Sequence, residues 1–317
     1  MPDISIIICC YNSAKRLPRT IEHIFKVENT EAQIEVIIVD NCSTDTTSKV
    51  AEFELNRYLK KIDYHIVHES KPGLYNARKR GCQVANYEWL LFCDDDNWLE
   101  CDYIINFLKN LNQYPHLKIF GCGISNPVFE KQPQKWFYSY QYLCAIFNIE
   151  EKKKNVMISN SIEEESFVCG AGMFVNKSLI YDYILDQNLK LEGRVGNQLS
   201  SGEDTDLVWF ALAKNQAVGQ FSNLKLQHYI TANRITKVYI VRLYKGINFS
   251  FSLLDYKYKS TTKTPKVFEF IYHYLNNLLH FNFLISRLIY AEFIGRYKAY
   301  RYIKKFDAST PHYFKQR

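Results

Sequence analysis

Three adjacent aspartates, Asp94, Asp95 and Asp96, follow directly on an apolar run, "WLLFC". Neighbouring carboxylates resist ionising together, so such a cluster at the end of a buried segment indicates either a bound cation or a solvated turn with a helix cap. Oxygen ligands at this spacing suit Mg²⁺ or Mn²⁺, which also bind substrate phosphates. In an extended segment, Asp94 and Asp96 would point the same way and Asp95 would point away.

A second acidic group, Glu203, Asp204 and Asp206, follows the glycine of "SSGEDTD". The helix dipole favours acidic residues in a first turn, so these carboxylates could simply begin a helix. A carboxylate held beside a reacting hydroxyl could also serve as a general base. The two interpretations stay open on these residues alone.

The elements that must position the first cluster alternate between apolar strands and helices. Strands are predicted at "ISIIICC", "IEVIIVD", "YHIVHE", "EWLLFCD" and "KIFGCG", with helical patterns between them. Uniformly apolar strands that alternate with helices predict a mostly parallel sheet with helices on both faces. Ligands bind such sheets beyond the carboxyl ends of the strands. Tyr11, Asp40 and Asp94 each stand at such an end and are therefore expected at one crevice.

Composition narrows the class of protein. The 317 residues are 47% hydrophobic and 23% charged, as in a globular protein with a substantial core. The nine cysteines form no C-x-x-C pair, and several lie in apolar runs, which predicts buried free thiols in a reducing compartment. The opening "MPDISIIICCYN" reads as a strand with no signal peptide, so a cytoplasmic location is expected.

Six segments together resemble family 2 glycosyltransferases, the inverting GT-A type. They are "SIIICCYN", "VIIVDNCSTDTT", "KPGLYNARKRG", "LLFCDDDNW", "CGAGM" and "GEDTDL", in the family's order and spacing over about residues 3 to 229. The resemblance implies a GT-A, Rossmann-like domain over residues 1–230. A basic, aromatic-rich helical region over residues 231–317 follows it.

The resemblance also implies roles for single residues. Those expected to bind the nucleotide-sugar are Tyr11, Asp40, Lys71, Arg78, Asp94, Asp95, Gly170 and Gly172. Asp96, in the motif that is similar to DxD, and His228 would bind Mn²⁺ or Mg²⁺. Asp204 would be the general base, with Glu203 as the other candidate.

The implied function is inverting transfer of one sugar from a nucleotide-sugar to a hydroxyl of a glycan or lipid-linked acceptor. The hexosyl- or N-acetylhexosaminyl-transferase type is expected. Processive relatives carry a Gln-Gln/x-x-Arg-Trp run after "GED", and this chain has none, which favours single transfer. Asn41 and Cys42 replace a common Asp-Gly, and Asn97 replaces a common Asp. These departures leave the base selectivity and the support of the metal site open.

Two alternatives stay open. A sugar-nucleotidyltransferase would share a similar sheet and metal, but it would usually carry a glycine-rich phosphate loop, and "CCYNSAKRLPRT" has no glycine. A catalytically inactive nucleotide-sugar-binding module is disfavoured by the presence of Asp96 and Asp204.

The C-terminal region differs from the rest in charge. From Ile230 onward, 16 Lys+Arg stand against 4 Asp+Glu, a net charge of +12, and the preceding residues have the other 24 and 29, a net charge of −5. Basic residues beside Tyr and Phe suit an anionic membrane surface, with peripheral attachment at its inner face. The alternative is packing on the catalytic domain or on a second subunit, as in a homodimer. No transmembrane helix is expected, because no apolar run reaches 18 residues, and no nucleic-acid module accompanies the charge.

Overall fold

The structure is a computed structural model that describes residues 2–28, 31–58, 62–162, 168–186, 191, 199, 201–261 and 265–309. The chain divides into two compact units. The first, here called the sheet unit, comprises Met1–Gln187 and Glu203–Ala232, and the second, the helical unit, comprises Asn188–Gly202 and Asn233–Arg317.

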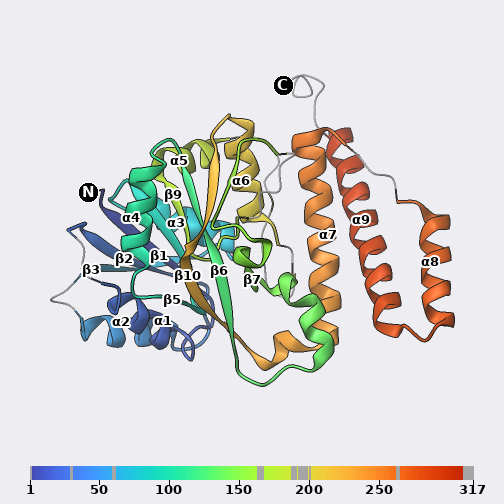
Figure 1. Ribbon diagram of the computed structural model, residues 1–317, viewed down its shortest axis with the longest axis horizontal. Helices are drawn as coiled ribbons and strands as arrows, with labels where there is room; N and C mark the ends of the chain where they lie inside the picture. The colour runs from blue at the N-terminus through green and yellow to red at the C-terminus, as the bar shows by residue number, and fades with distance from the viewer. Residues whose placement is uncertain are drawn as a thin grey trace. The chain divides into compact units, whose positions relative to one another are not determined.

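A single mixed sheet forms the centre of the sheet unit, in the order β3-β2-β1-β4-β9-β6-β10-β5, with β7 beside β6 and β8 beside β10 (Figure 1). Strands β1, β2, β3, β4, β6 and β10 run in one direction. The strands are β1 (Ile4–Cys10), β2 (Ile34–Asn41), β3 (Asp63–Glu69), β4 (Trp89–Asp94), β5 (Asn97–Leu99), β6 (Ile119–Phe129), β7 (Phe147–Asn148), β8 (Val156–Ser159), β9 (Met173–Asn176) and β10 (Val218–Ile230).

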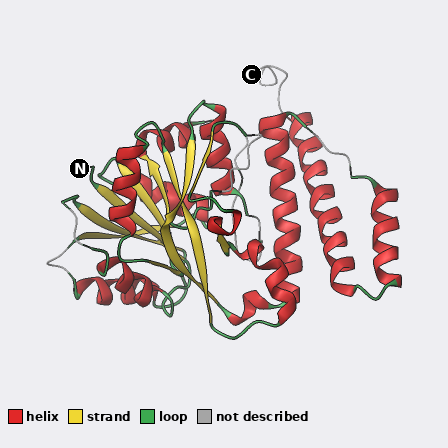
Figure 2. Ribbon diagram, viewed as in Figure 1, coloured by secondary structure: helices red, strands yellow, loops and turns green. Residues whose placement is uncertain are grey.

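Helices cover both faces of this sheet (Figure 2). Side chains alternate along β1, so Ile6 and Ile8 join the core formed with α1, α2 and α4, whereas Ile7 meets α3 on the other face. The helices of the unit are α1 (Leu17–Phe25), α2 (Thr47–Asn56), α3 (Leu74–Val84), α4 (Tyr103–Gln113), α5 (Lys177–Leu185) and α6 (Glu203–Ala213), with 3₁₀ segments η1 (Lys135–Cys144) and η2 (Ile149–Lys152).

Helix α3 approaches the sheet closely at Gly81. A Cβ atom there would lie 2.4 Å from Cγ2 of Ile7, so only glycine fits without a shift. This glycine lets α3 pack closely on the sheet, and Arg78, one turn earlier on the same helix, lies 3.7 Å from Asp94 at the end of β4.

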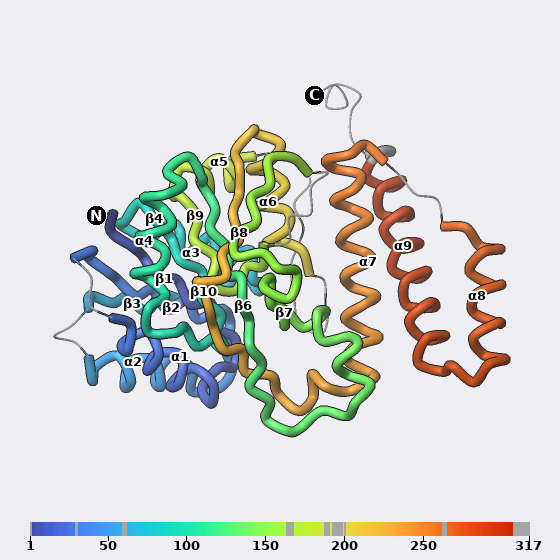
Figure 3. Tube along the Cα trace, viewed as in Figure 1, coloured from blue at the N-terminus to red at the C-terminus, as the bar shows by residue number. Residues whose placement is uncertain are grey.

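The helical unit contains α7 (Lys237–Lys259), α8 (Val267–Leu279) and α9 (Phe283–Ser309), and the 3₁₀ segment η3 (Ala232–Ile235) precedes them. Within this unit α9 packs on both α7 and α8 and lies between them (Figure 3). None of the helices in the described part of the chain combines the length and the apolarity that a bilayer crossing needs.

The predicted fold class is therefore confirmed: an α/β domain with a central, mostly parallel sheet and a C-terminal helical region. All nine cysteines lie in the described ranges and are free. Five of them are buried, and Cys101 is exposed.

Candidate active site

The register of the sheet brings the carboxyl ends of three strands together. Cys10, the last residue of β1, pairs with Asp40 of β2, and Cys9 pairs with Asp94 of β4. Asp40 and Asp94 therefore flank the point where the chain leaves β1 and reaches Tyr11. The three residues predicted to meet at the strand ends thus lie at one edge of the sheet.

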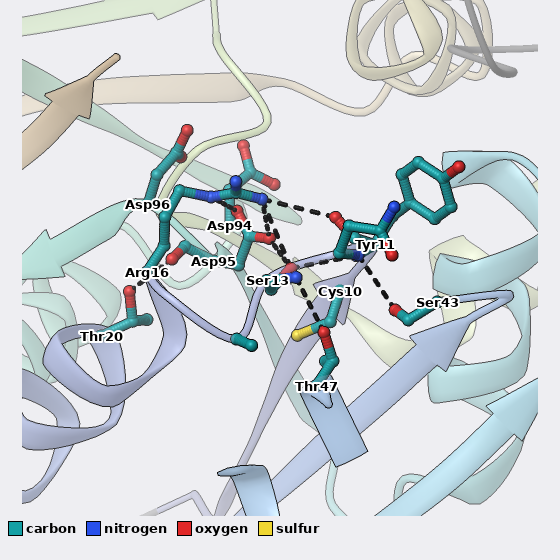
Figure 4. Close-up of polar contacts among 12 residues, drawn as sticks. Cys10, Tyr11, Ser13, Arg16, Thr20, Ser43, Thr47, Asp94, Asp95 and Asp96 are labelled. Atoms are coloured by element: carbon teal, nitrogen blue, oxygen red, sulfur yellow. Dashed lines mark hydrogen bonds and ion pairs between the residues drawn. The ribbon is translucent and has the colours of Figure 1, made fainter. Parts of the chain in front are cut away.

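The three aspartates have three different surroundings (Figure 4). Asp94 ends β4, and Asp95 and Asp96 form the turn before β5. A carboxylate oxygen of Asp94 lies 3.7 Å from Nη2 of Arg78 on α3. Oδ1 of Asp96 lies 3.6 Å from Nε2 of His228 on β10. The turn, rather than an extended strand, separates Asp95 from the other two.

Asp95 is buried and holds the turn onto the start of α1. Its carboxylate accepts hydrogen bonds from Arg16, at 2.7 Å from Nη2 and 3.2 Å from Nε, and from the hydroxyl of Ser13, and its carbonyl accepts from Thr20 at 2.8 Å. Burial and the adjacent Asp96 raise the pKa of Asp95 to about 6, while Arg16 opposes this shift. The carboxylate of Asp95, which was expected to contact the nucleotide-sugar, is therefore already bonded to residues of the protein itself.

Asn97 stands where many family members have Asp. Its side chain supports the turn that carries the three aspartates. Asn97 is fully buried, its side-chain oxygen accepts from the backbone N–H of Asp94 at 3.2 Å, and its amide donates to Asp96 at 3.3 Å. Pairing of β10 with β5 sets His228 opposite Asn97, and the N–H of Tyr229 donates to the carbonyl of Asp96 at 2.8 Å. These backbone bonds explain why Asp96 and His228 face each other.

Arg78 connects the two acidic motifs. Its side chain is mostly buried, and its guanidinium lies 5.1 Å from the ring centroid of Phe92. Burial disfavours the charge, but Asp94, Glu203 and Asp204 outweigh this and raise the pKa of Arg78. One buried cation therefore lies within the field of carboxylates from both motifs.

Gly170 allows this approach. A Cβ atom at this position would lie 2.6 Å from Nη2 of Arg78 and 3.1 Å from the Cβ of Asp204. Gly172 has a different role: its φ is +69°, and a Cβ atom would lie 2.3 Å from the hydroxyl of the buried Tyr103. Both glycines of "CGAGM" are thus required by packing.

The three acids of "GEDTD" also differ. Asp204 is partly exposed, and its carboxylate accepts from the N–H of Gly170 at 2.8 Å and of Thr205 at 2.9 Å. Glu203 is buried, and Asp206 is fully buried and accepts from the hydroxyl of Tyr183 at 2.9 Å. Of the three, Asp204 is the carboxylate that a solvent-borne hydroxyl can reach.

Three of the residues to which the family resemblance assigned nucleotide binding lie at or just after the ends of β1, β2 and β3. Tyr11 is 53% exposed, and its ring points away from the three aspartates in Figure 4. Asp40 is buried, and it accepts from the backbone N–H of Ser43 at 3.1 Å and from the hydroxyl of Ser48. The side chain of Lys71 is exposed.

Asn41 clamps the loop that carries Lys71. Its amide donates to the carbonyls of Glu69 at 3.1 Å and Lys71 at 2.7 Å, and its oxygen accepts from the N–H of Gly73 at 2.8 Å. This residue, noted only as a departure from the family pattern, therefore has a defined structural task.

Arg16 and Ser13, which bind the carboxylate of Asp95, were not among the site residues expected from the sequence. Both lie in "NSAKR", directly after the first strand, and a basic residue at that place was the available signal. Within the described residues, no group of three or more His, Cys, Asp or Glu side chains could hold a metal ion. Asp96 and His228, with 3.6 Å between Oδ1 and Nε2, thus lie together as a pair and belong to no larger cluster of this kind among those residues.

Comparison with known proteins identifies the family of this chain. Glycosyl transferase family 2 matches residues 5–184, which is more than half of the chain. The chain belongs to glycosyl transferase family 2. The resemblance drawn from the six motifs, and with it the glycosyltransferase class, is confirmed at the level of the family.

Individual relatives are more distant. The chain is 29% identical over 119 residues to the putative glycosyltransferase EpsH of Bacillus subtilis, which covers 37% of this chain and 33% of that protein. The chain thus spans about a third of the length of this curated relative.

Two solved structures share the fold. Staphylococcus aureus TarS in complex with UDP-GlcNAc is 15% identical, with a TM-score of 0.53 over 95% of this chain and 92% of that one. The mannosyltransferase PcManGT of Pyrobaculum calidifontis, in complex with GDP-Man and Mn²⁺, is 14% identical, with a TM-score of 0.58 over 98% and 78%. At these identities the likeness supports the GT-A fold.

Proposed function

We propose that the protein transfers one sugar from a nucleoside diphosphate-sugar to a hydroxyl group of a glycan or lipid-linked acceptor, with inversion at the anomeric carbon. The observation that carries the proposal is the convergence on Arg78. Asp94, from the strand-end motif, lies 3.7 Å from its guanidinium, and Gly170 lies close to both Arg78 and Asp204. A donor held at the strand ends would thus lie next to a reachable carboxylate.

Asp204 is the proposed general base. The acceptor O–H loses its proton to this carboxylate while its oxygen forms a bond to the anomeric carbon and the diphosphate leaves with the electrons of the broken C–O bond. Two backbone N–H groups orient Asp204, and its partial exposure leaves room for the acceptor. The positive charge of Arg78 offsets the negative charge of Asp94 and Asp204.

The donor is proposed from the ligands of the two similar structures, a UDP-sugar and a GDP-sugar. Tyr11, Asp40 and Lys71 would surround the base and ribose, because they lie at or just after the carboxyl ends of the neighbouring parallel strands β1, β2 and β3. An exposed aromatic ring with acceptor groups nearby suits a flat base with polar edges.

A divalent ion fits the pair formed by Asp96 and His228. One carboxylate and one imidazole are suitable ligands for Mn²⁺, and such ions commonly complete their shell with substrate phosphates and water. The ion would neutralise charge on the leaving diphosphate. With two protein ligands, we expect metal and nucleotide to bind tightly only together.

The test is a thermal-unfolding panel of UDP, GDP, CMP and dTDP sugars, each with and without Mn²⁺. One base series should raise the Tm, because a ligand at 100 times its Kd stabilises the fold by about 2.7 kcal/mol. Mn²⁺ should enlarge the rise in wild type and leave it unchanged in Asp96→Ala. If every nucleotide-sugar left the Tm unchanged, donor binding would be ruled out. An equal effect of Mn²⁺ in Asp96→Ala would remove the metal assignment.

A further inference from the structure

Helix α8 exposes an unusual amount of apolar surface. All thirteen of its residues are described, and none is buried. Its exposed large apolar side chains are Val267, Phe268, Ile271, Tyr272, Leu275 and Leu279, and Phe281 and Phe283 continue them beyond the helix. Phe268 is 89% exposed and Leu279 is 76% exposed. A contiguous apolar surface of this kind marks a site of interaction.

The exposed side chains form one stripe, here called the α8 stripe: Phe268, Ile271, Tyr272, Leu275 and Leu279. Their spacing of three and four residues puts them on one side of a helix. The other side of α8 serves the internal packing of the unit. Phe270 stacks on Phe293 of α9 with ring centroids 4.2 Å apart, and Tyr274 lies 6.3 Å from Tyr290. The α8 stripe is therefore not needed to hold α8 on α9.

The charge of this region indicates which kind of partner could bind the α8 stripe. Residues from Ile230 onward have a net charge of +12. Exposed basic side chains accompany the helices of the unit: Lys266, Arg287, Lys298, Arg301, Lys304 and Lys305. A second copy of the chain would bring an equal positive charge to the interface, whereas an anionic lipid surface is complementary to it.

The size of α8 also matters. Thirteen residues make a helix of about 20 Å, shorter than the roughly 30 Å hydrocarbon core of a bilayer. A short helix with an aromatic and aliphatic stripe suits an orientation along the surface, with the stripe among the headgroups and upper acyl chains.

We propose that the α8 stripe docks on an anionic lipid bilayer. The stripe enters the headgroup region, and the basic side chains of the same unit bind the negative surface. This docking is independent of the transfer reaction, so its test uses lipid binding and requires no sugar or acceptor.

Flotation of the full chain with vesicles tests the proposal. Vesicles with one third phosphatidylglycerol should carry the protein, and pure phosphatidylcholine vesicles should carry much less. Binding should weaken as salt screens the surface charge. Phe268→Ser and Leu279→Ser should each weaken binding by about tenfold, because each removes a large apolar side chain from the interface. Phe53→Ser is the matched control: Phe53 lies on α2 of the sheet unit and is also exposed, at 68%, and its loss should leave binding unchanged.

A second measurement, fluorescence quenching, uses substitutions that keep an aromatic ring and therefore do not remove apolar surface from the helix. Phe268→Trp and Phe53→Trp keep an aromatic ring at each position and add one tryptophan to the four present. Brominated lipids in anionic vesicles should quench the fluorescence added by Trp at position 268. They should leave the fluorescence added at position 53 unchanged.

Four results would overturn the proposal. The first is no flotation with anionic vesicles at low salt. The second is flotation that Phe268→Ser and Leu279→Ser leave unchanged, with equal quenching at positions 268 and 53, which would place lipid contact elsewhere. The third is a concentration-dependent dimer in sedimentation that Phe268→Ser abolishes, without vesicle binding, which would make a second copy the occupant. Equal binding to neutral vesicles would overturn the selectivity for anionic lipid.

Discussion

The two units use the same kinds of side chain in opposite ways. At the strand ends of the sheet unit, one member of each ion pair is largely buried: Asp95 in its pair with Arg16, and Arg78 in its pair with Asp94. In the helical unit, the pair at the start of α8, Lys266 with Glu269, is exposed, and so are the large apolar residues of the α8 stripe. A buried charge must have a fixed partner, whereas an exposed charge keeps its water. The sheet unit is therefore built to hold a precise polar geometry, and the helical unit to present a surface.

The largest effect is expected where the polar geometry meets the chemistry. Asp204→Asn keeps size and shape but cannot take a proton, so transfer should fall by about 10²–10⁴-fold while nucleotide-sugar binding, measured by calorimetry, is retained. Asp206→Asn is the control, because that carboxylate is bound to Tyr183, and its loss should lower stability more than the rate of transfer. An active Asp204→Asn with an inactive Glu203→Gln would move the base to Glu203.

The next effect concerns the buried cation of the sheet unit. Arg78→Met preserves much of the side-chain volume but leaves Asp94, Glu203 and Asp204 without their shared cation. Removing one partner of a fully buried ion pair typically costs about 3–5 kcal/mol. Asp94 and Asp204 are partly exposed, so the free energy of unfolding in urea should fall by less, about 1–3 kcal/mol. Arg57→Met, on the exposed side of α2, should unfold at the wild-type midpoint. Wild-type stability in Arg78→Met would mean that the convergence does not hold the site together.

A smaller effect is expected at the turn that carries the aspartates. A double-mutant cycle with Arg16→Met and Asp95→Asn should give a coupling energy of about 0.5–3 kcal/mol in urea unfolding, as for residues of one hydrogen-bonded network. Two guanidinium nitrogens of Arg16, Nη2 and Nε, lie 2.7 and 3.2 Å from the carboxylate of Asp95. Such a two-point contact favours a coupling energy in the upper part of this range. Additive effects of the two substitutions would show that Asp95 is held by other contacts.

The smallest effect is expected in the helical unit. A cycle on Lys266→Ala and Glu269→Ala should give about 0.2–1 kcal/mol, because both groups are exposed and the pair is screened by salt. The value should fall further in 0.5 M NaCl, while the coupling of Arg16 and Asp95 should change little. A coupling at Lys266 as large as that at Arg16 would contradict the contrast between the units.

Local patterns in the sequence are sufficient for much of the fold. Continuous apolar runs rich in β-branched residues predict buried strands, and their alternation with helices predicts a parallel sheet. The parallel order in turn places the residues after β1, β2 and β4 at one edge, so Tyr11, Asp40 and Asp94 could be expected to lie together. The family resemblance added the roles of Asp96, His228 and Asp204, which stay proposals.

Contacts between distant segments could not be obtained in this way. Arg16 and Asp95 are 79 residues apart, and no local pattern pairs them. The position of Arg78 beside Gly170 depends on how closely α3 packs on the sheet, which Gly81 permits. The sequence shows Asn41 only as a departure from the family pattern. Its role depends on the loop after β3, which folds onto its side-chain amide.

The sequence by itself therefore determined the strands, the parallel order that gathers their ends, and the charge contrast between the two parts of the chain. These depend on periodicity and composition, which are local properties. Only the tertiary structure decided which of the aspartates faces a cation, which glycine admits an arginine and which stripe of α8 stays exposed. Those outcomes depend on how closely segments far apart in the chain approach one another, and that distance is set by the packing of whole elements.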